Sequence, residues 1–279
     1  MGKGRYGWVE WWDEYYVDER PQPYDWFCSC HYMATLIESL VRVEEEILMV
    51  GCGNAPFSDD LHALGFTRQI NIDNCELVIN QQRARYPHLN WDIGDVRTMS
   101  YNTGRFDVVF DKGLLDNMYC YRSPEENCAA ALSEMYRVLR PGGIFIVLSC
   151  HEASEVRGSM TADPNWMWDS VDVLHLRNPR FPPHGNVRVA AFTMVVAQKK
   201  VTSPDENCGR SIDTSRLGDI TSPEDGGRLL LSAEELEGMK QRVAEMNAQR
   251  RASFPNPTVS SAELDTGDSP GVQGGAEES

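Results

Sequence analysis

Short apolar segments alternate with amphipathic segments between residues 46 and 148, and this alternation limits the possible folds more than any other feature of the chain. Apolar runs typical of buried strands occupy residues 46–50, 68–73, 89–93, 105–111 and 144–148. Apolar residues at helical spacing predict helices at 31–41, 58–64, 76–85 and 124–139. Strands that alternate with helices form crossover units, so the sequence predicts an α/β fold with a mostly parallel sheet.

A proline and two glycines mark the end of the last predicted long helix. Arg140-Pro141-Gly142-Gly143 stops the last long helix, because proline and glycine both interrupt helical structure. After the strand at 144–148, residues 171–176 and 187–197 predict a hairpin that closes the sheet. The sequence therefore predicts two more strands beyond the alternating region.

Aromatic residues mark a boundary near Lys199-Lys200. All seven Trp and all ten Tyr precede it, and Phe254 is the one aromatic residue after it. A segment so poor in apolar residues cannot bury enough surface to offset the entropy of ordering. We therefore expect a folded domain at 1–200 and an acidic, largely disordered tail at 201–279. Within the tail, a capping-box pattern predicts a short helix at 232–251, either transient or docked on a partner.

Charge and cysteine usage exclude several classes of protein. The net charge is −16, which differs from the basic footprint of a nucleic-acid-binding protein, so we expect no direct nucleic-acid partner. An acidic surface suits a basic partner, but it also simply keeps a protein soluble. No apolar run is long enough to span a membrane, and no apolar signal core follows the N-terminus. Eight scattered cysteines without a CxxC pair predict reduced thiols, no metal site and a cytoplasmic protein, which we expect to be a monomer.

Parallel sheets of this type bind ligands beyond the carboxyl ends of their strands. Gly51-Cys52-Gly53 follows the first strand there, and glycines let the backbone turn sharply and let a ligand approach the main chain. The third glycine of the dinucleotide-binding fingerprint is missing, which disfavours a pyrophosphate ligand. The turn therefore indicates either a site for another ligand or a plain connection from strand to helix.

Acidic residues follow the next three strands. Asp73 ends the second strand, where a carboxylate accepts hydrogen bonds from a ribose diol; a helix cap is the alternative. Asp95 and Val96 follow the third strand and are placed to meet the edge of an adenine ring beside an apolar wall. Asp111-Lys112 ends the fourth strand at the same rim, where a structural Asp–Lys contact is the alternative to a ligand contact.

These features together resemble the class I S-adenosylmethionine-dependent methyltransferases and, within that class, the eukaryotic lysine methyltransferases of translation elongation factor one-alpha. The generic family has an acid where Met49 stands, and this subfamily shares the departure. The resemblance implies a Rossmann-like, seven-stranded, mostly parallel sheet with helices on both faces. It covers residues 6–150 well and 151–198 loosely, without the tail. The segments that carry it are Trp12-Asp13-Glu14-Tyr15-Tyr16, Pro23-Tyr24-Asp25-Trp26-Phe27, Ile47 to Asn54, Asp95-Val96-Arg97, Phe106 to Asp116 and Val138 to Gly143.

The resemblance implies S-adenosyl-L-methionine as the cofactor. Trp12, Tyr16 and Trp26 would fold over it from the N-terminal segment, since aromatic faces attract a sulfonium cation and exclude water. Packing in the core is the alternative for these aromatic residues. In the other implied contacts, Gly51 lines the methionine end, Asp73 holds the ribose, Asp95 and Val96 bracket the adenine, and Lys112 lies by the polar end of the cofactor. Gly53 is also an implied cofactor-binding residue.

The reaction implied by the resemblance is N-methylation of a protein lysine, with elongation factor one-alpha as the protein partner. The sequence identifies no general base, so the catalytic residues are unknown, but Asp111 and Asp116 are candidates to orient the incoming ammonium. Leu114 replaces a threonine of the subfamily, which affects contacts on the substrate side. His151, after the fifth strand, either touches substrate or is an ordinary surface residue.

Two other functions stay open at this point. The first is a methyltransferase of the same fold that acts on a small molecule, since a fold does not fix a substrate. The second is a binding module that keeps the fold without catalysis. Binding of S-adenosylmethionine separates the second alternative from the enzymes.

Overall fold

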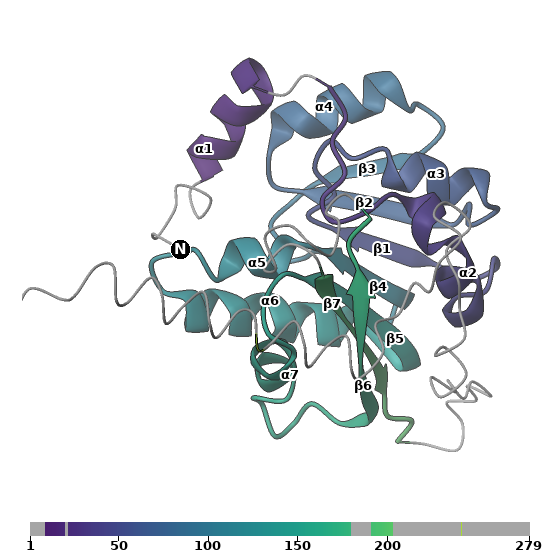
Figure 1. Cartoon of the computed structure of the whole chain (residues 1–279), viewed down its shortest axis with the longest axis vertical. Helices are drawn as coiled ribbons and strands as arrows, with labels where there is room; N and C mark the ends of the chain where they lie inside the picture. The colour runs from purple at the N-terminus through teal and green to yellow at the C-terminus, as the bar shows by residue number, and fades with distance from the viewer. Residues whose placement is uncertain (1–8, 20–21, 180–190, 203–240, 242–279) are drawn as a thin grey trace, which may run out of the picture.

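The computed structural model describes residues 9–19, 22–179, 191–202 and 241. Its centre is a seven-stranded sheet with the order β3-β2-β1-β4-β5-β7-β6, and helices lie against it (Figure 1). Strand β7 is antiparallel to β5 and β6, and the other paired strands are parallel. The strands are β1 (Ile47–Val50), β2 (Gln69–Asp73), β3 (Asn90–Ile93), β4 (Phe106–Lys112), β5 (Leu139–Ser149), β6 (Trp168–Arg177) and β7 (Ala191–Lys199).

Helices cover both faces of this sheet. They are α1 (Val9–Glu14), the π-helix η2 (Tyr15–Glu19), α2 (Cys30–Leu40), α3 (Phe57–Ala63), α4 (Glu76–Arg85), α5 (Leu114–Met118), α6 (Pro124–Val138) and α7 (Ala153–Met160). Ile47 and Met49 of β1 belong to one buried apolar cluster with α2 and α3. Leu48 and Val50 belong to another with α5, α6 and α7. Successive residues of a strand point to opposite faces, so β1 is buried on both sides.

The register of the strands brings their carboxyl ends together. Val50 at the end of β1 lies opposite Ile72 of β2 and Asp111 of β4. Lys112 at the end of β4 lies opposite Leu148 of β5. The loops that leave these strands therefore meet at one edge of the sheet, as expected for a ligand site in a parallel α/β fold.

The α/β fold and the seven-stranded, mostly parallel sheet are as predicted, and all seven strands occur. Four elements were not predicted: α1, η2, α5 and α7. Strand β5 begins at Leu139 rather than at 144, because Leu139 pairs with Phe106 of β4 and extends the ladder through the expected helix stop. The predicted helix at 232–251 lies outside the described residues except for position 241, as do residues 187–190 of the expected last strand.

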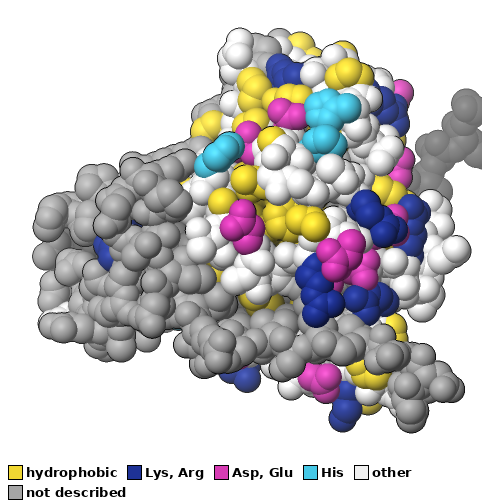
Figure 2. All heavy atoms as spheres, turned by 90° about the vertical axis from the view of Figure 1, so that its right-hand side faces the viewer, with side chains coloured by type: hydrophobic (Ala, Val, Ile, Leu, Met, Phe, Trp, Pro, Cys, Tyr) yellow, Lys and Arg dark blue, Asp and Glu magenta, His cyan; other side chains and the backbone are white. Residues whose placement is uncertain are grey.

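Charge distribution, helix composition and the state of the cysteines also bear on the sequence-based expectations. On the face drawn in Figure 2, basic and acidic side chains lie beside each other. Within the described residues, no helix combines the length and the apolar character that a membrane crossing requires. In the same part of the chain no disulfide joins the cysteines, and Cys28 and Cys30 are buried in the core.

Two glycines provide a matched test of the packing. A methyl group on Gly143 in β5 would lie 2.7 Å from the Asp107 carbonyl oxygen, whereas one on Gly158 in α7 would meet nothing within 4 Å. We expect Gly143→Ala to lower the free energy of unfolding by about 1–3 kcal/mol, because backbone must move. Gly158→Ala should raise it by up to about 1 kcal/mol through helix propensity. Chemical denaturation measures both, and equal effects would contradict the described packing around β5.

Candidate functional site

A cavity of about 440 Å³ opens at the carboxyl ends of the parallel strands. This volume falls in the usual range for sites that bind small ligands. The loops after β1, β2, β3, β4 and β5 line it, together with the segment before α2. All nine residues expected to contact the cofactor are among the lining residues: Trp12, Tyr16, Trp26, Gly51, Gly53, Asp73, Asp95, Val96 and Lys112.

The glycine turn after β1 is closely packed from two sides. Gly51 and Gly53 have φ values of 59° and 54°, in the left-handed region that glycine adopts without strain. A Cβ atom on Gly51 would lie 2.8 Å from the Cβ of Leu114 in α5. One on Gly53 would lie 2.8 Å from the Tyr16 hydroxyl oxygen. The turn therefore needs glycine for its backbone and for the close approach of α5 and η2.

Asp73 connects the ends of β1 and β2. Its Oδ2 accepts a hydrogen bond from the Gly53 amide at 2.9 Å, and its Oδ1 accepts one from the Cys75 amide at 3.0 Å. Burial raises the pKa of Asp73, and these backbone donors oppose the rise. The Asn74 amide is a third backbone donor to this carboxylate. Two carboxylate oxygens offer about four lone-pair sites, so Asp73 retains capacity to accept a hydroxyl donor from a ligand.

Asp95 is held differently from the sequence-based expectation. Arg97 Nε lies 3.0 Å from both of its carboxylate oxygens, and the Arg97 amide donates to Oδ1 at 2.8 Å. Burial acts to raise the pKa of Asp95, but the hydrogen bonds from Arg97 outweigh it and hold that pKa below its usual range. Asp95 lines the cavity, and both of its carboxylate oxygens are already hydrogen-bonded to Arg97. Val96 beside it is buried and supplies an apolar wall.

Aromatic side chains of the N-terminal segment line the cavity. Trp12 stacks on Tyr16, with ring centroids 5.7 Å apart. Tyr16 is buried against α4 in an apolar cluster that also holds Val78. Trp26 is 39% exposed and meets Tyr24 edge to face. Aromatic rings that line a cavity provide an apolar, electron-rich surface for a flat or cationic ligand.

Lys112 ties the segment around Asp25 to the end of β4. Its Nζ donates to Asp25 Oδ1 at 2.7 Å and to the Trp26 carbonyl oxygen at 3.2 Å. The side chains of Lys112 and Asp25 are 7% and 5% exposed. Lys112 therefore does make a structural contact with an aspartate, the alternative to a ligand contact, but the partner is Asp25 and not the neighbouring Asp111.

Asp111 supports the site from beneath rather than facing it. It is fully buried and is not among the cavity-lining residues. Its two carboxylate oxygens accept the amides of Leu114 and Leu115 at 2.7 and 3.0 Å, which caps α5. Burial and the nearby Asp116 raise its pKa to about 7. The expectation that Asp111 contacts a substrate is therefore corrected, because its buried carboxylate binds the backbone amides at the start of α5.

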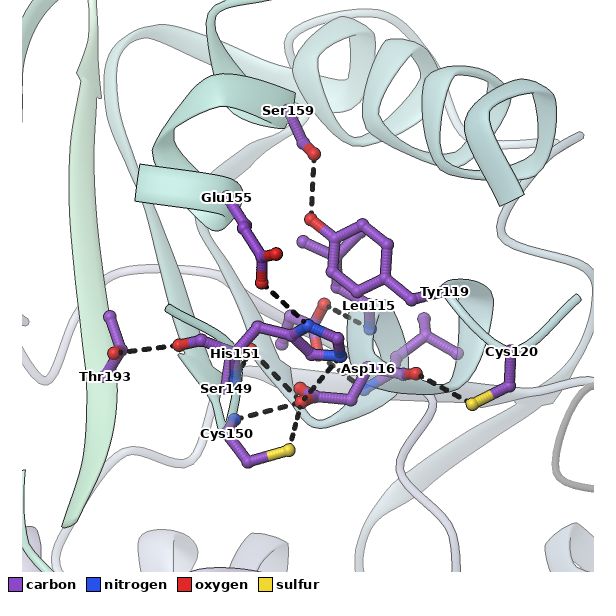
Figure 3. Close-up of polar contacts among 12 residues, drawn as sticks. Leu115, Asp116, Tyr119, Cys120, Ser149, Cys150, His151, Glu155, Ser159 and Thr193 are labelled. Atoms are coloured by element: carbon purple, nitrogen blue, oxygen red, sulfur yellow. Dashed lines mark hydrogen bonds and ion pairs between the residues drawn. The ribbon is translucent and has the colours of Figure 1, made fainter. Parts of the chain in front are cut away.

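Asp116 does line the cavity, and it anchors a polar cluster after β5 (Figure 3). Its Oδ1 accepts hydrogen bonds from the Ser149 hydroxyl at 3.1 Å and from the Cys150 amide at 2.9 Å. Its Oδ2 is shielded from solvent and has no hydrogen-bond partner within the described part of the chain. Burial raises the pKa of Asp116, and the contacts from Cys150 and His151 oppose this rise. Asp116 thus brings to the cavity wall a carboxylate of which one oxygen lacks a donor among the described residues.

Comparison with known proteins agrees with this geometry. A family model described as a methyltransferase domain matches residues 48–147. The chain carries a class I methyltransferase domain. The mouse protein EEF1A lysine methyltransferase 4 is 34% identical over 157 residues, which cover 52% of this chain and 62% of that protein. The eEF1A lysine and N-terminal methyltransferase of Bos taurus is 27% identical over 203 residues, which cover 68% of this chain and 28% of that protein.

Solved structures of low sequence identity share the fold of the methyltransferase domain. One, from work on the conversion of a disulfide bond into a thioacetal group in echinomycin biosynthesis, has a TM-score of 0.53 at 18% identity and covers 71% of this chain and 95% of its own. A chain from the complex of the Haloferax volcanii Trm112 activator with a methyltransferase has a TM-score of 0.50 at 15% identity and covers 68% and 98%. At such identities the likeness concerns the fold alone.

The cofactor of a class I methyltransferase domain is S-adenosylmethionine, and the cavity fits it on several grounds. The half-buried carboxylate of Asp73 retains capacity to accept from a diol. Gly51 and Gly53 line the cavity and have no side chains, so a ligand can approach the backbone of the turn at these two positions. The wall at Val96 is apolar and the cover at Trp12 and Tyr16 is aromatic. Each feature matches one part of a cofactor that combines a nucleoside with a sulfonium.

The methyltransferase domain also contains site features that the sequence did not reveal. Asp25 was recognised only as part of a matching segment, and nothing in the sequence indicated its pairing with Lys112. Tyr121 and Asn178 line the cavity from loops that carry no motif. His151 had been weighed against a surface role, and it lines the cavity. The available signal was its position directly after a predicted parallel strand.

Asp73 provides the direct test of cofactor binding by the methyltransferase domain. We expect Asp73→Ala to abolish binding of S-adenosylmethionine in calorimetry, because the carboxylate that accepts the diol is removed. Asp59→Ala is the matched control, since Asp59 pairs with His88 at 2.9 Å and does not line the cavity. An affinity like that of the wild type in Asp73→Ala would contradict the ribose assignment.

Proposed function

We propose that this chain is an S-adenosylmethionine-dependent protein-lysine N-methyltransferase that acts on translation elongation factor one-alpha. The observation that carries the proposal is Asp116, a carboxylate that lines the cavity and whose Oδ2 has no hydrogen-bond partner among the described residues. A buried polar atom without a partner is costly, so the site gains when a donor reaches it. The relatives named as EEF1A lysine methyltransferases support lysine as that donor.

The residues of the chain suit an amine that must lose its charge before it reacts. Asp116 would accept an N–H of the incoming ammonium and hold its nitrogen in place, which supplies much of the rate. Burial beside the aromatic cover disfavours the charged form and lowers the pKa of the amine. When bound, S-adenosylmethionine supplies an electrophilic methyl group on a sulfonium. The aromatic rings of Trp12, Tyr16 and Trp26 would exclude water from this chemistry.

The assignments of individual residues belong to the same proposal. Asp73 would hold the ribose and Val96 the adenine face, with Asp95 fixing the loop through Arg97. Gly51 and Gly53 would let the cofactor approach the backbone. Lys112 would act through Asp25 by holding Trp26 over the cavity, as its bond to the Trp26 carbonyl suggests.

The organisation of the whole chain is also proposed. We place the catalytic domain at 1–200 with an N-terminal segment that covers the cofactor, followed by an acidic tail. We propose a cytoplasmic monomer, which suits a substrate of the translation machinery. The acidic character of the chain, with a net charge of −16, favours a basic surface on the protein partner.

Methyl transfer to purified elongation factor one-alpha tests the substrate. With tritiated S-adenosylmethionine, we expect label on that protein, and mass spectrometry should place the methyl groups on a lysine side chain. A companion reaction should contain a small-molecule fraction of a cell extract as the acceptor. Label in small molecules, with none on elongation factor one-alpha, would contradict the proposal and favour a metabolite methyltransferase of the same fold.

Asp116→Asn tests the proposed role of this carboxylate. The change keeps the size of the side chain and removes its charge, so we expect kcat/KM for the protein substrate to fall by about 100-fold, in line with the loss of a buried, charge-assisted contact. Affinity for S-adenosylmethionine should stay as in the wild type. Asp163→Asn is the control, since Asp163 is hydrogen-bonded to Asn165 outside the cavity. Unchanged kcat/KM in Asp116→Asn would remove Asp116 from the proposal.

A further inference from the structure

His151 follows β5 and faces the cavity next to Asp116 (Figure 3). Its Nε2 lies 3.9 Å from Asp116 Oδ1, so the two side chains border the same small space. The imidazole is 33% exposed, and the ring of Tyr119 lies against it with centroids 4.5 Å apart. The ring thus stands beside the carboxylate proposed to receive the substrate ammonium.

Glu155 fixes the orientation and the tautomer of this ring. Its Oε2 lies 3.2 Å from His151 Nδ1, across one turn at the start of α7. A carboxylate only accepts hydrogen bonds, so the proton of the neutral ring belongs on Nδ1 and Nε2 keeps its lone pair. The backbone is fixed as well, because the Thr193 hydroxyl donates to the His151 carbonyl oxygen at 3.1 Å. An unprotonated Nε2 on an imidazole that is oriented by a carboxylate is the arrangement of a general base with an orienting acid.

Tyr119 and Cys150, two other titratable residues around this space, are unsuited to take up a proton at neutral pH. Burial raises the pKa of Tyr119 to about 12. Burial and the nearby Asp116 raise the pKa of the Cys150 thiol well above its usual range, so it stays protonated. Glu155 is 61% exposed and faces away from the cavity, on the far side of the imidazole. His151, by contrast, brings a basic ring nitrogen to this space, 3.9 Å from Asp116 Oδ1.

We propose that His151 is the catalytic base of the reaction and that Glu155 is its positioning residue; this inference rests on the proposed lysine methylation. One N–H bond of the substrate ammonium breaks, its electron pair stays on the substrate nitrogen, and the proton goes to Nε2 of His151. The imidazolium is stabilised by Asp116 on one side and Glu155 on the other. It returns its extra proton to bulk water, which the exposed Glu155 contacts.

The main experiment is the pH dependence of kcat/KM for elongation factor one-alpha in the variant His151→Gln. At pH 7 we expect a loss of about 100- to 10,000-fold, the usual contribution of a general base. The loss should shrink as pH rises towards about 10, because free lysine loses its proton near pH 10.4. Affinity for S-adenosylmethionine should not change. A loss that is the same at every pH, or no loss, would overturn the assignment.

His88→Gln is the matched control. His88 also pairs with a carboxylate, at 2.9 Å from Asp59, but it does not line the cavity, so its pH profile should follow the wild type. Glu155→Gln should give a smaller loss than His151→Gln with a shifted pH profile. If the wild-type enzyme methylates no protein, the proposed function is refuted. If the wild-type enzyme methylates elongation factor one-alpha and His151→Gln is equally active, only the role of His151 is refuted.

A measurement without substrate tests the same geometry. Nitrogen-15 NMR of the histidine rings reports the tautomer, and we expect neutral His151 to carry its proton on Nδ1, with the preference lost in Glu155→Gln. A proton on Nε2 would overturn the proposal. The donor atoms of Asp116, Cys150 and His151 lie within 4.8 Å of one another, so a bound cation is the rival explanation. Activity that EDTA removes and Zn²⁺ restores would also overturn the role of His151 as a base.

Discussion

The buried ion pair between Lys112 and Asp25 shapes the site more than any other single interaction. The two side chains are 87 positions apart in the sequence and meet at 2.7 Å with almost no exposure to solvent. Removal of one partner of such a pair typically costs about 3–5 kcal/mol, because the other charge stays buried alone. The pair holds the segment before α2 against the end of β4. Trp26 and Tyr24 stand over the cavity because this segment is fixed.

The parallel sheet then determines which residues gather beneath that cover. Strands in register deliver Gly51, Asp73 and Lys112 to one edge. Asp111 contributes from within, because its carboxylate caps α5 and so places Leu114 against the glycine turn and Asp116 at the cavity. The same short segment therefore serves the fold and the site: Asp111 organises helix α5, and Asp116, five positions later, lines the cavity.

The sequence predicted the parts of the fold that depend on local pattern. Buried strands appear as apolar runs, and the topology of a parallel sheet then assembles Asp73, Val96 and Lys112 at one edge without knowledge of any contact. Helix α5 was missed because its five residues are too short to display helical periodicity. The N-terminal helices α1 and η2 were missed because an aromatic-rich stretch does not show whether it packs in a core or covers a cavity.

Other features depend on contacts between distant residues and leave no trace in spacing. Nothing local distinguishes Asp111, which turns inward to cap a helix, from Asp116, which faces the cavity. Asp95 lines the cavity as expected for a ligand contact, but its spacing did not reveal that Arg97, two positions later, holds both of its oxygens. The pairing of His151 with Glu155 follows from the start of α7, a helix that the sequence did not predict. These outcomes were decided by tertiary structure.

The most direct measurement is a crystal structure of the protein with S-adenosylhomocysteine. Our account predicts the ribose within hydrogen-bond distance of Asp73, the adenine against Val96, and the rings of Trp12 and Tyr16 over the ligand. It also predicts that the sulfur faces the side of the cavity that holds Asp116 and His151. A nucleoside bound elsewhere, or a sulfur that faces away from that side, would contradict the account.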